Sequence, residues 1–297
     1  MEFTSFKTLV REEVERRAGK KYRVRLNDVM KNNGVVLSGL TVMQDDSNIS
    51  PTIYLNDYYN AYENGRTTLG MVINDVMDVY NRNKVNRKLD MRYFLNYEHV
   101  KEQIVLKLIN TEKNKELLSD IPHVEFLDLS IVFQVLISDE NIGGASVMIH
   151  NAHAKLWGVD SKELYKCALK NTPKLLKYEI KGMNDVICEI METDRASAPC
   201  CGEIPMYVLS NSRRIDGAAC MIYPQLIEDF ATAVGGNLYI IPSSVHELLL
   251  LPACAVDNGE EPINIIKEVN ETQLLTEEIL SDSLYVYDCK EKAIKIF

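Results

Sequence analysis

Apolar residues in the first third of the chain recur at spacings that separate helices from strands. Over residues 3–18 they lie three or four positions apart between charged residues, and Gly19 follows as a C-cap, so an amphipathic helix is predicted there. A second group of apolar residues with the same three- and four-residue spacing predicts a helix over residues 67–81. β-Branched and alternating stretches predict a hairpin with a long or bulged loop and then a third strand, at residues 22–26, 35–42 and 51–55.

The middle third of the chain contains both helix-like and strand-like spacings of apolar residues. We predict a polar linker or exposed loop over residues 80–92 and a helix over residues 98–118. The β-branched run at residues 124–137 indicates one long or bent strand, or two paired strands. A strand over residues 145–149 leads through a turn into a helix, and Asp160, with a glutamate three positions later, is the expected N-cap of the next helix.

Short strands alternate with helices in the prediction for the last third. A helix over residues 182–192 precedes a loop rich in small residues, and a helix that begins at residue 223 or 224 stops at Gly235 and Gly236. Residues 245–255 form a buried strand or a short helix. The expected strands are residues 206–209, 218–222 and 238–241, followed by a closing hairpin of residues 284–287 and 293–297.

These elements predict an α+β fold with a mixed, largely antiparallel sheet and packed helices. Helices and strands are mixed in order, whereas a doubly wound parallel sheet would make them alternate strictly. At 297 residues the chain is long enough for two subdomains. We place an N-terminal α+β region at residues 1–95 and a C-terminal α+β domain at residues 96–297.

The composition of the chain indicates the cellular compartment in which we expect the protein. The chain is 46% apolar and 26% charged, as globular proteins are. It shows no apolar stretch of the roughly 20 residues that a membrane-spanning helix needs, and no secretory signal. Seven scattered cysteines suit reduced thiols better than a disulfide framework. We therefore expect a cytoplasmic protein without membrane contact.

The net charge of −10 is concentrated near the C-terminus, because residues 201–297 hold 6 Lys and Arg against 15 Asp and Glu. Such a surface repels a phosphate backbone, so we do not expect nucleic acid as a partner. It suits a protein partner with a basic surface. The alternative is a solvated acidic exterior that maintains solubility. The oligomeric state is not indicated.

Familiar catalytic motifs are absent. The chain has no phosphate-binding glycine loop, no Rossmann fingerprint, no zinc-protease helix and no hydrolase elbow. His150 and His153 share a helical face, but two ligands do not complete a zinc site, and the adjacent pair Cys200-Cys201 does not chelate one ion comfortably. We expect no metal and no cofactor.

Two predicted turns carry polar side chains that could contact a ligand or partner. Arg213 and Arg214 follow a strand, and guanidinium groups bind phosphate or carboxylate, although one arginine could instead pair with Asp216 or Glu203. The turn at residues 242–247 combines hydroxyls, an imidazole and a carboxylate; Ser243 or Ser244 as an N-cap with Glu247 in capping-box register is the alternative. The candidate contact residues are Asn211, Arg213, Arg214, Ser243, Ser244, His246 and Glu247, together with His150 and Asn151 at the junction before the middle helix.

The segments 206–211, 217–220, 226–230 and 235–247 resemble an uncharacterised bacterial family, a domain-of-unknown-function group found mainly in anaerobic Gram-positive bacteria. The specific signature spans residues 206–252, and the likeness extends over roughly residues 50–295. The resemblance implies no activity and no catalytic residues.

Two functions remain as hypotheses. The first is a binding or regulatory protein that acts through protein–protein contacts, which the acidic C-terminal third and the missing motifs favour. The second is a hydrolase-type enzyme with a pocket where residues 150–153, 210–214 and 242–247 converge.

Overall fold

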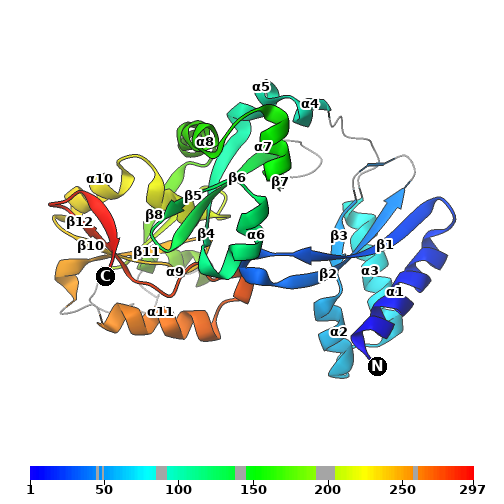
Figure 1. Cartoon of the computed structure of the whole chain (residues 1–297). Coiled ribbons are helices and arrows are strands. Elements are labelled where there is room, and N and C mark those ends of the chain that lie inside the picture. Colours follow the sequence, from blue (N-terminus) through cyan, green and yellow to red (C-terminus); the bar gives the residue numbers. More distant parts are fainter. Residues whose placement is uncertain (45–46, 49, 85–91, 138–144, 192–204, 257–259) are drawn as a thin grey trace. The chain divides into compact units, whose positions relative to one another are not determined.

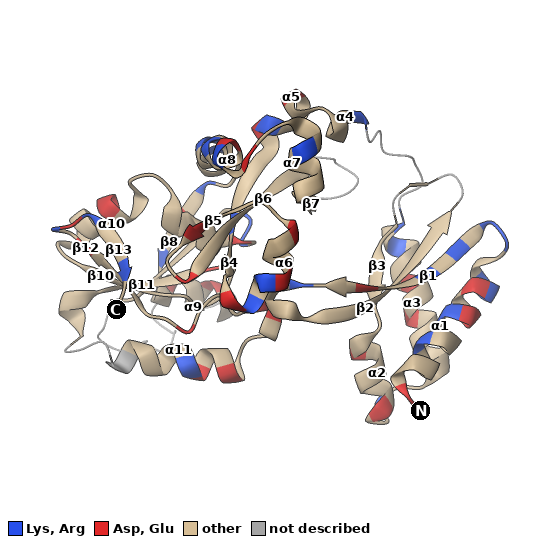
Figure 2. Ribbon diagram, in the orientation of Figure 1, with Lys and Arg blue, Asp and Glu red and all other residues tan. Residues whose placement is uncertain are grey.

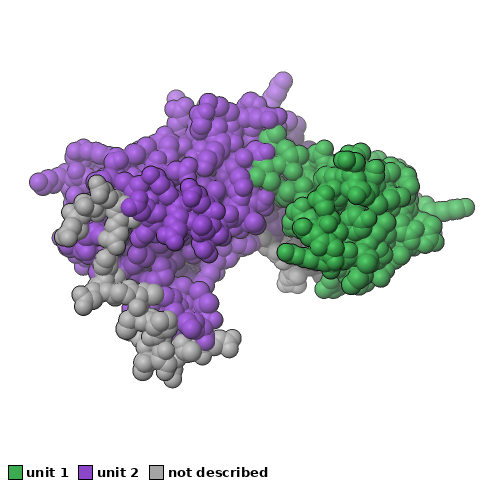
Figure 3. All heavy atoms as spheres, turned by 90° about the horizontal axis from the view of Figure 1, so that it is seen from below, with its two compact units in different colours: residues 1–31, 35–93, 138–143 green, residues 32–34, 94–137, 144–297 purple. Residues whose placement is uncertain are grey.

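The computed structural model describes the chain except residues 45, 46, 49, 85–91, 138–144, 192–204 and 257–259. Two compact units make up the described chain (Figure 3). The smaller unit contains the described residues within 1–31 and 35–93. The larger unit contains residues 32–34, 94–137 and the described residues from 145 to 297.

The smaller unit is a three-stranded antiparallel sheet, in the order β1-β2-β3, packed against helices (Figure 1). Its core joins α1 to the sheet and to α3, for example through Phe6, Leu40 and Val76, all fully buried. Val24 of β1 and the alternate residues Leu40 and Val42 of β2 are buried in this core. The elements are α1 (Phe3–Ala18), β1 (Tyr22–Met30), β2 (Val36–Gln44), β3 (Thr52–Tyr54), α2 (Asn56–Glu63) and α3 (Leu69–Asn83). The short helix α4 (Arg92–Leu95) contains the boundary between the units, which lies after residue 93.

The larger unit contains a six-stranded sheet in the order β13-β12-β10-β11-β9-β8 and a four-stranded sheet in the order β4-β6-β5, with β7 also paired to β6. Every strand pair in both sheets is antiparallel. The strands are β4 (Ile104–Asn110), β5 (His123–Phe126), β6 (Leu129–Ile137), β7 (Ala145–Met148), β8 (Tyr178–Gly182), β9 (Tyr207–Asn211), β10 (Leu238–Ile241), β11 (Leu248–Pro252), β12 (Tyr285–Asp288) and β13 (Ala293–Ile296).

Helices cover these sheets (Figure 1). The α-helices are α5 (Tyr97–Val100), α6 (Lys115–Asp120), α7 (Asn151–Trp157), α8 (Ser161–Leu175), α9 (Met183–Met191), α10 (Leu226–Val234) and α11 (Glu260–Thr272). The short 3-10 helices are η1 (Asn32–Gly34), η2 (Lys101–Gln103), η3 (Glu112–Asn114), η4 (Gly217–Ile222), η5 (Ala253–Ala255) and η6 (Thr276–Glu278).

Both faces of the six-stranded sheet are apolar. The largest core cluster contains side chains of both sheets, such as Phe133 of β6 and Tyr285 of β12, and a second cluster on the opposite face joins Tyr239 to Ile266 of α11. Burial on both faces explains the uninterrupted leucine run of β11, because such a strand shows no alternation of apolar and polar residues.

Most predicted elements are confirmed, and the α+β class with antiparallel sheets is confirmed as well. Asp160 N-caps α8, because its carboxylate accepts the backbone N–H of Glu163 at 2.9 Å. The run at residues 124–137 forms two paired strands, β5 and β6, and residues 245–255 contain a strand, β11.

Two predicted elements are wrong. Residues 98–118 do not form one helix, since β4 occupies residues 104–110 between short helical turns. Residues 218–222 form the 3-10 helix η4 instead of a strand. Both segments are buried almost throughout, so their sequence carries no periodicity that could tell a strand from a helix. The prediction also missed β8 and α11.

Candidate functional site

The first of the two predicted turns follows β9 and is closed by the side chain of Asn211. Its carboxamide oxygen accepts the N–H of Arg213 at 3.0 Å, and its amide donates to the carbonyl of Ile215 at 2.8 Å. Arg214 and Asp216 both adopt left-handed backbone conformations, with φ of 51° and 54°. This conformation is unfavourable for arginine and better tolerated by aspartate, and the hydrogen bonds of Asn211 help to hold the turn in shape.

The second turn, residues 242–247, packs directly on the first. The Ser210 hydroxyl donates to the His246 carbonyl at 2.8 Å, and the Asp216 N–H donates to Nδ1 of His246 at 3.1 Å. Gly217 lies between the turns, where an added Cβ would come closer than 3.0 Å to the Ser210 hydroxyl and to the His246 carbonyl oxygen. Only glycine allows this approach, so the structure brings residues 210–214 and 242–247 together as one cluster.

No helix begins at Ser243 or Ser244, which corrects the predicted capping box. The Ser244 hydroxyl accepts the N–H of His246 at 3.0 Å, and the Ser244 N–H donates to the carbonyl of Glu247 at 3.1 Å. The serine therefore stabilises a tight turn between β10 and β11. Serine favours this local bond in turns for the same reason that it caps helices.

An ion pair lies beneath the first turn. Lys107 Nζ, from β4, lies 2.9 Å from Asp216 Oδ1, and these side chains are only 17% and 13% exposed. The pair connects the four-stranded sheet to the turn. The adjoining cavity measures about 20 Å³ and is lined in part by Arg213, Ile215 and Asp216. This volume suits a single water molecule and is far below that of a small-molecule pocket.

Arg214 of the first turn forms an ion pair with helix α9. Arg214 lies 3.0 Å from Glu189 of α9, and Glu189 also pairs with Lys181 at 2.6 Å. Hydrogen bonds from Lys181 and then Arg214 lower the pKa of Glu189. The acidic partner of Arg214 is thus Glu189, whereas Asp216 pairs with Lys107; Glu203 lies outside the described residues.

His246 is not arranged as a general base. Because Nδ1 accepts the Asp216 N–H, the neutral ring carries its proton on Nε2, which lies 3.9 Å from Oε1 of Glu278. Among the described residues, no serine hydroxyl of the two turns hydrogen-bonds an imidazole nitrogen. Nucleophilic catalysis of the serine–histidine type needs that bond, so this arrangement does not favour the hydrolase hypothesis.

The junction at His150 forms a separate cluster. His150 Nδ1 lies 2.7 Å from Oδ2 of Asp120, and the His150 N–H donates to Nδ1 of His153 at 3.0 Å. Asn151 donates to the carbonyl of Ser119 at 3.2 Å. Burial, followed by the nearby His150, lowers the pKa of His153. These bonds tie the junction to α6, and none of them joins it to the other two turns.

An acidic segment adjoins the second turn. The N–H of Val245 donates to the carbonyl of Glu278 at 2.8 Å, which places η6 beside residues 242–247. Upstream of η6, the last five residues of α11 contain Glu268 and Glu271, and its last turn contains no basic residue (Figure 2). The sequence indicated the acidic character of this region but not the helix that carries it.

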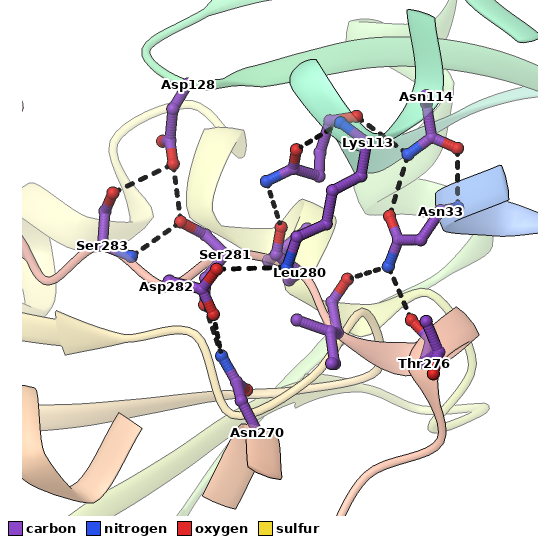
Figure 4. A network of polar contacts seen from close by, with 12 residues as sticks. Asn33, Lys113, Asn114, Asp128, Asn270, Thr276, Leu280, Ser281, Asp282 and Ser283 are labelled. Atoms are coloured by element: carbon purple, nitrogen blue, oxygen red, sulfur yellow. Dashed lines mark hydrogen bonds and ion pairs between the residues drawn. The ribbon is translucent and has the colours of Figure 1, made fainter. Parts of the chain in front are cut away.

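Residues 32–34, which belong to the larger unit, hold η6 from its other side. The Asn33 side-chain amide donates to the carbonyls of Thr276 and Ile279, both at 2.7 Å, and its oxygen accepts from the amide of Asn114 at 3.0 Å (Figure 4). Asn33 adopts a left-handed conformation, with φ of 59°, which asparagine tolerates better than most residues. The position of η6 is therefore set by side-chain amides.

The segment after η6 is fixed by two carboxylates (Figure 4). Asp282 pairs with Lys113 at 3.1 Å and accepts from Asn270 at 2.7 Å. Burial raises its pKa, but the bonds from Lys113 and Asn270 outweigh burial and lower it. Asp128 accepts from the hydroxyls of Ser281 at 2.6 Å and Tyr285 at 2.7 Å.

Sequence reasoning missed several residues that organise this region. Lys107 lies in a strand that was predicted as a helix, and Glu278 and Asn33 were not singled out. Asn33 followed by Gly34 is a turn signal, but nothing local shows which carbonyl groups the Asn33 side chain would meet.

The model of a family of unknown function, DUF5688, matches residues 3–289. The chain belongs to this family. The match confirms the resemblance to a family without known activity and covers nearly the whole chain. No curated protein and no solved structure matches this DUF5688 chain.

Two further findings concern the described part of the chain. None of its helices is long and apolar enough to cross a membrane. The same residues include no group of three or more histidine, cysteine, aspartate or glutamate side chains placed to hold a metal ion.

Proposed function

We propose that this DUF5688 protein is a non-catalytic binding or regulatory protein whose acidic face binds a protein partner with a basic surface. The acidic face is formed by Glu268 and Glu271 of α11 and Glu277 of η6. The observation that carries the proposal is that these three carboxylates form no ion pair with any residue that the structure describes. Other acidic residues of the C-terminal third do pair, such as Asp282 with Lys113 and Glu228 with Lys292.

The position of these glutamates is unfavourable for folding. Exposed carbonyl groups make the C-terminal end of a helix negative, so a carboxylate there costs about 0.3–1 kcal/mol. Glu268 and Glu271 lie at that end of α11, where lysine or arginine would stabilise the helix. A binding role for the negative potential accounts for residues that folding alone does not favour.

The two turns support this face in the proposal. Val245 and His246 contact Glu278, and their own turn is held by Ser210 and Asp216. We therefore assign Asn211, Arg213, Arg214, Ser243, Ser244 and Glu247 to the structure that positions η6 or borders the contact. The described cavity at the turns holds about one water, which does not support the hydrolase alternative.

Affinity capture from cell extract at moderate salt tests the proposal, with bound proteins identified by mass spectrometry. The test variant is Glu268→Lys with Glu271→Lys. The control is Glu102→Lys with Glu125→Lys, which makes the same change in net charge at exposed residues that form no ion pair within the described chain.

We expect the wild type and the control to capture the same basic partner, released by raised salt, and the test variant to lose it. The test variant should also unfold at a slightly higher temperature, because lysine suits the end of α11. Absence of an enriched protein in repeated captures, or equal capture by the test variant, would contradict the proposal.

We extend the proposal to the cellular location of the protein and to the boundary between its two domains. We infer a bacterial cytoplasmic protein, in keeping with its scattered cysteines. We also propose that residues 1–95 fold independently of residues 96–297, which expression of residues 1–95 alone would test through a cooperative thermal transition.

A further inference from the structure

β8 is an edge strand of the six-stranded sheet. Within the described chain it pairs only with β9, and none of its residues, Tyr178 to Gly182, is buried. An edge strand presents unpaired N–H and C=O groups, which form a template for another strand. The outer side of β8 is therefore a surface on which a further strand can add to the sheet.

The hydrogen bonds to β9 show which groups point outward. The Ser212 N–H donates to the Lys177 carbonyl, and the Met183 N–H donates to the Met206 carbonyl. Both bonds belong to the register that pairs β8 with β9, so residues 177, 179, 181 and 183 direct their backbone groups to β9. Tyr178 and Ile180 direct their N–H and C=O groups away from the sheet. Gly182 immediately precedes α9, which begins at Met183, so its carbonyl accepts the first hydrogen bond of that helix.

The side chains of this edge are self-complementary. The strand reads Tyr-Glu-Ile-Lys-Gly, so its two charges, of opposite sign, flank Ile180 symmetrically. When two such strands run antiparallel about Ile180, Glu179 of each faces Lys181 of the other. Ile180 of one copy then lies opposite Ile180 of the other as a hydrogen-bonded pair, the register that its outward backbone groups require.

We propose that a second copy of this chain pairs with β8, which joins the two six-stranded sheets into one continuous antiparallel sheet. A twofold dimer uses the same patch on both copies, so a patch must be complementary to itself. The arrangement of Glu179, Ile180 and Lys181 meets this condition in both charge and backbone register. A foreign strand would not require such symmetry.

Exposed apolar side chains near β8 also favour pairing with a second copy of the chain. Tyr178 is 52% exposed, and Ile190, on the neighbouring helix α9, is 72% exposed. Lys181 binds Glu189 of α9 at 2.6 Å and lies 4.0 Å from Glu179, so both charges are already held at the edge. Pairing of two copies would remove part of this apolar surface from water.

Charge-reversal variants test the dimer by sedimentation or by light scattering after size exclusion. The wild type is expected at twice the chain mass of 33.8 kDa. Glu179→Lys places lysine opposite lysine, and Lys181→Glu places glutamate opposite glutamate, so each variant alone should dimerise about ten- to a hundred-fold more weakly. A mixture of the two variants restores opposite charges at both positions, and a heterodimer is expected.

The mixture distinguishes lost pairing from lost folding, because misfolded variants would not recover a partner. A wild type that stays monomeric over the whole measurable concentration range would overturn the proposal, and so would two folded variants that do not combine. The Glu268→Lys, Glu271→Lys variant should remain a dimer, so failure here and failure of the acidic-face proposal are separate results.

Discussion

Gly217→Ala should strongly destabilise the larger unit, because the two turns leave no room for a methyl group. The added Cβ would lie less than 3.0 Å from the Ser210 hydroxyl, the His246 carbonyl oxygen and the Asn211 nitrogen. Two of these atoms are backbone atoms, so a change of side-chain rotamer cannot relieve the clash. The turns must move apart.

The expected cost follows from that movement. Overpacking of a filled site costs about 1–3 kcal/mol. Separation of the turns also weakens the bonds from Ser210 and Asp216 to His246, each worth about 0.5–1.5 kcal/mol. Together these effects lower the free energy of unfolding by about 2–6 kcal/mol, a shift of about 1–3 M in urea midpoint at a slope of about 2–3 kcal/mol per M.

Urea unfolding followed by tryptophan fluorescence measures this change, since the chain has one tryptophan, Trp157, and it lies in the larger unit. Gly236→Ala is the matched control, because its added Cβ would meet no atom within 4 Å. A Gly217→Ala protein that unfolds within about 0.5 kcal/mol of wild type, the range of neutral surface substitutions, would refute the close approach of the turns.

Two further predictions concern charges in the larger unit. Lys107→Met should cost about 2–3 kcal/mol, because it leaves the carboxylate of Asp216 largely buried and unpaired, and addition of Asp216→Asn should recover part of that loss in a double-mutant cycle; additive losses would show that the pair is not coupled. The pKa of Asp282 is lowered from its usual 3.8, so its stabilising effect is complete above that value and is lost as the pH falls through the lower folded-state pKa. Acid unfolding should therefore become less steep in Asp282→Asn, and an unchanged profile would contradict this.

Local sequence patterns correctly predicted the elements that have one face exposed to solvent. The helix α1, the hairpin of β1 and β2, and the cap of α8 at Asp160 all follow from periodicity or from a single side-chain bond to a nearby N–H. The same patterns failed for β4 and η4, because a segment buried on every side has no polar face from which its period can be recognised.

The features of the candidate site also fall into those that the sequence determined and those that the tertiary structure decided. The sequence by itself determined which turns are polar and that the C-terminal third is acidic, since both depend only on residue type and order. Tertiary structure alone decided that Asp216 pairs with Lys107, that Asn33 binds the carbonyls around η6, and that the charges of β8 lie at an edge of the described sheet. Those outcomes depend on the sheet order, which brings together segments far apart in the chain, and no local preference encodes that order.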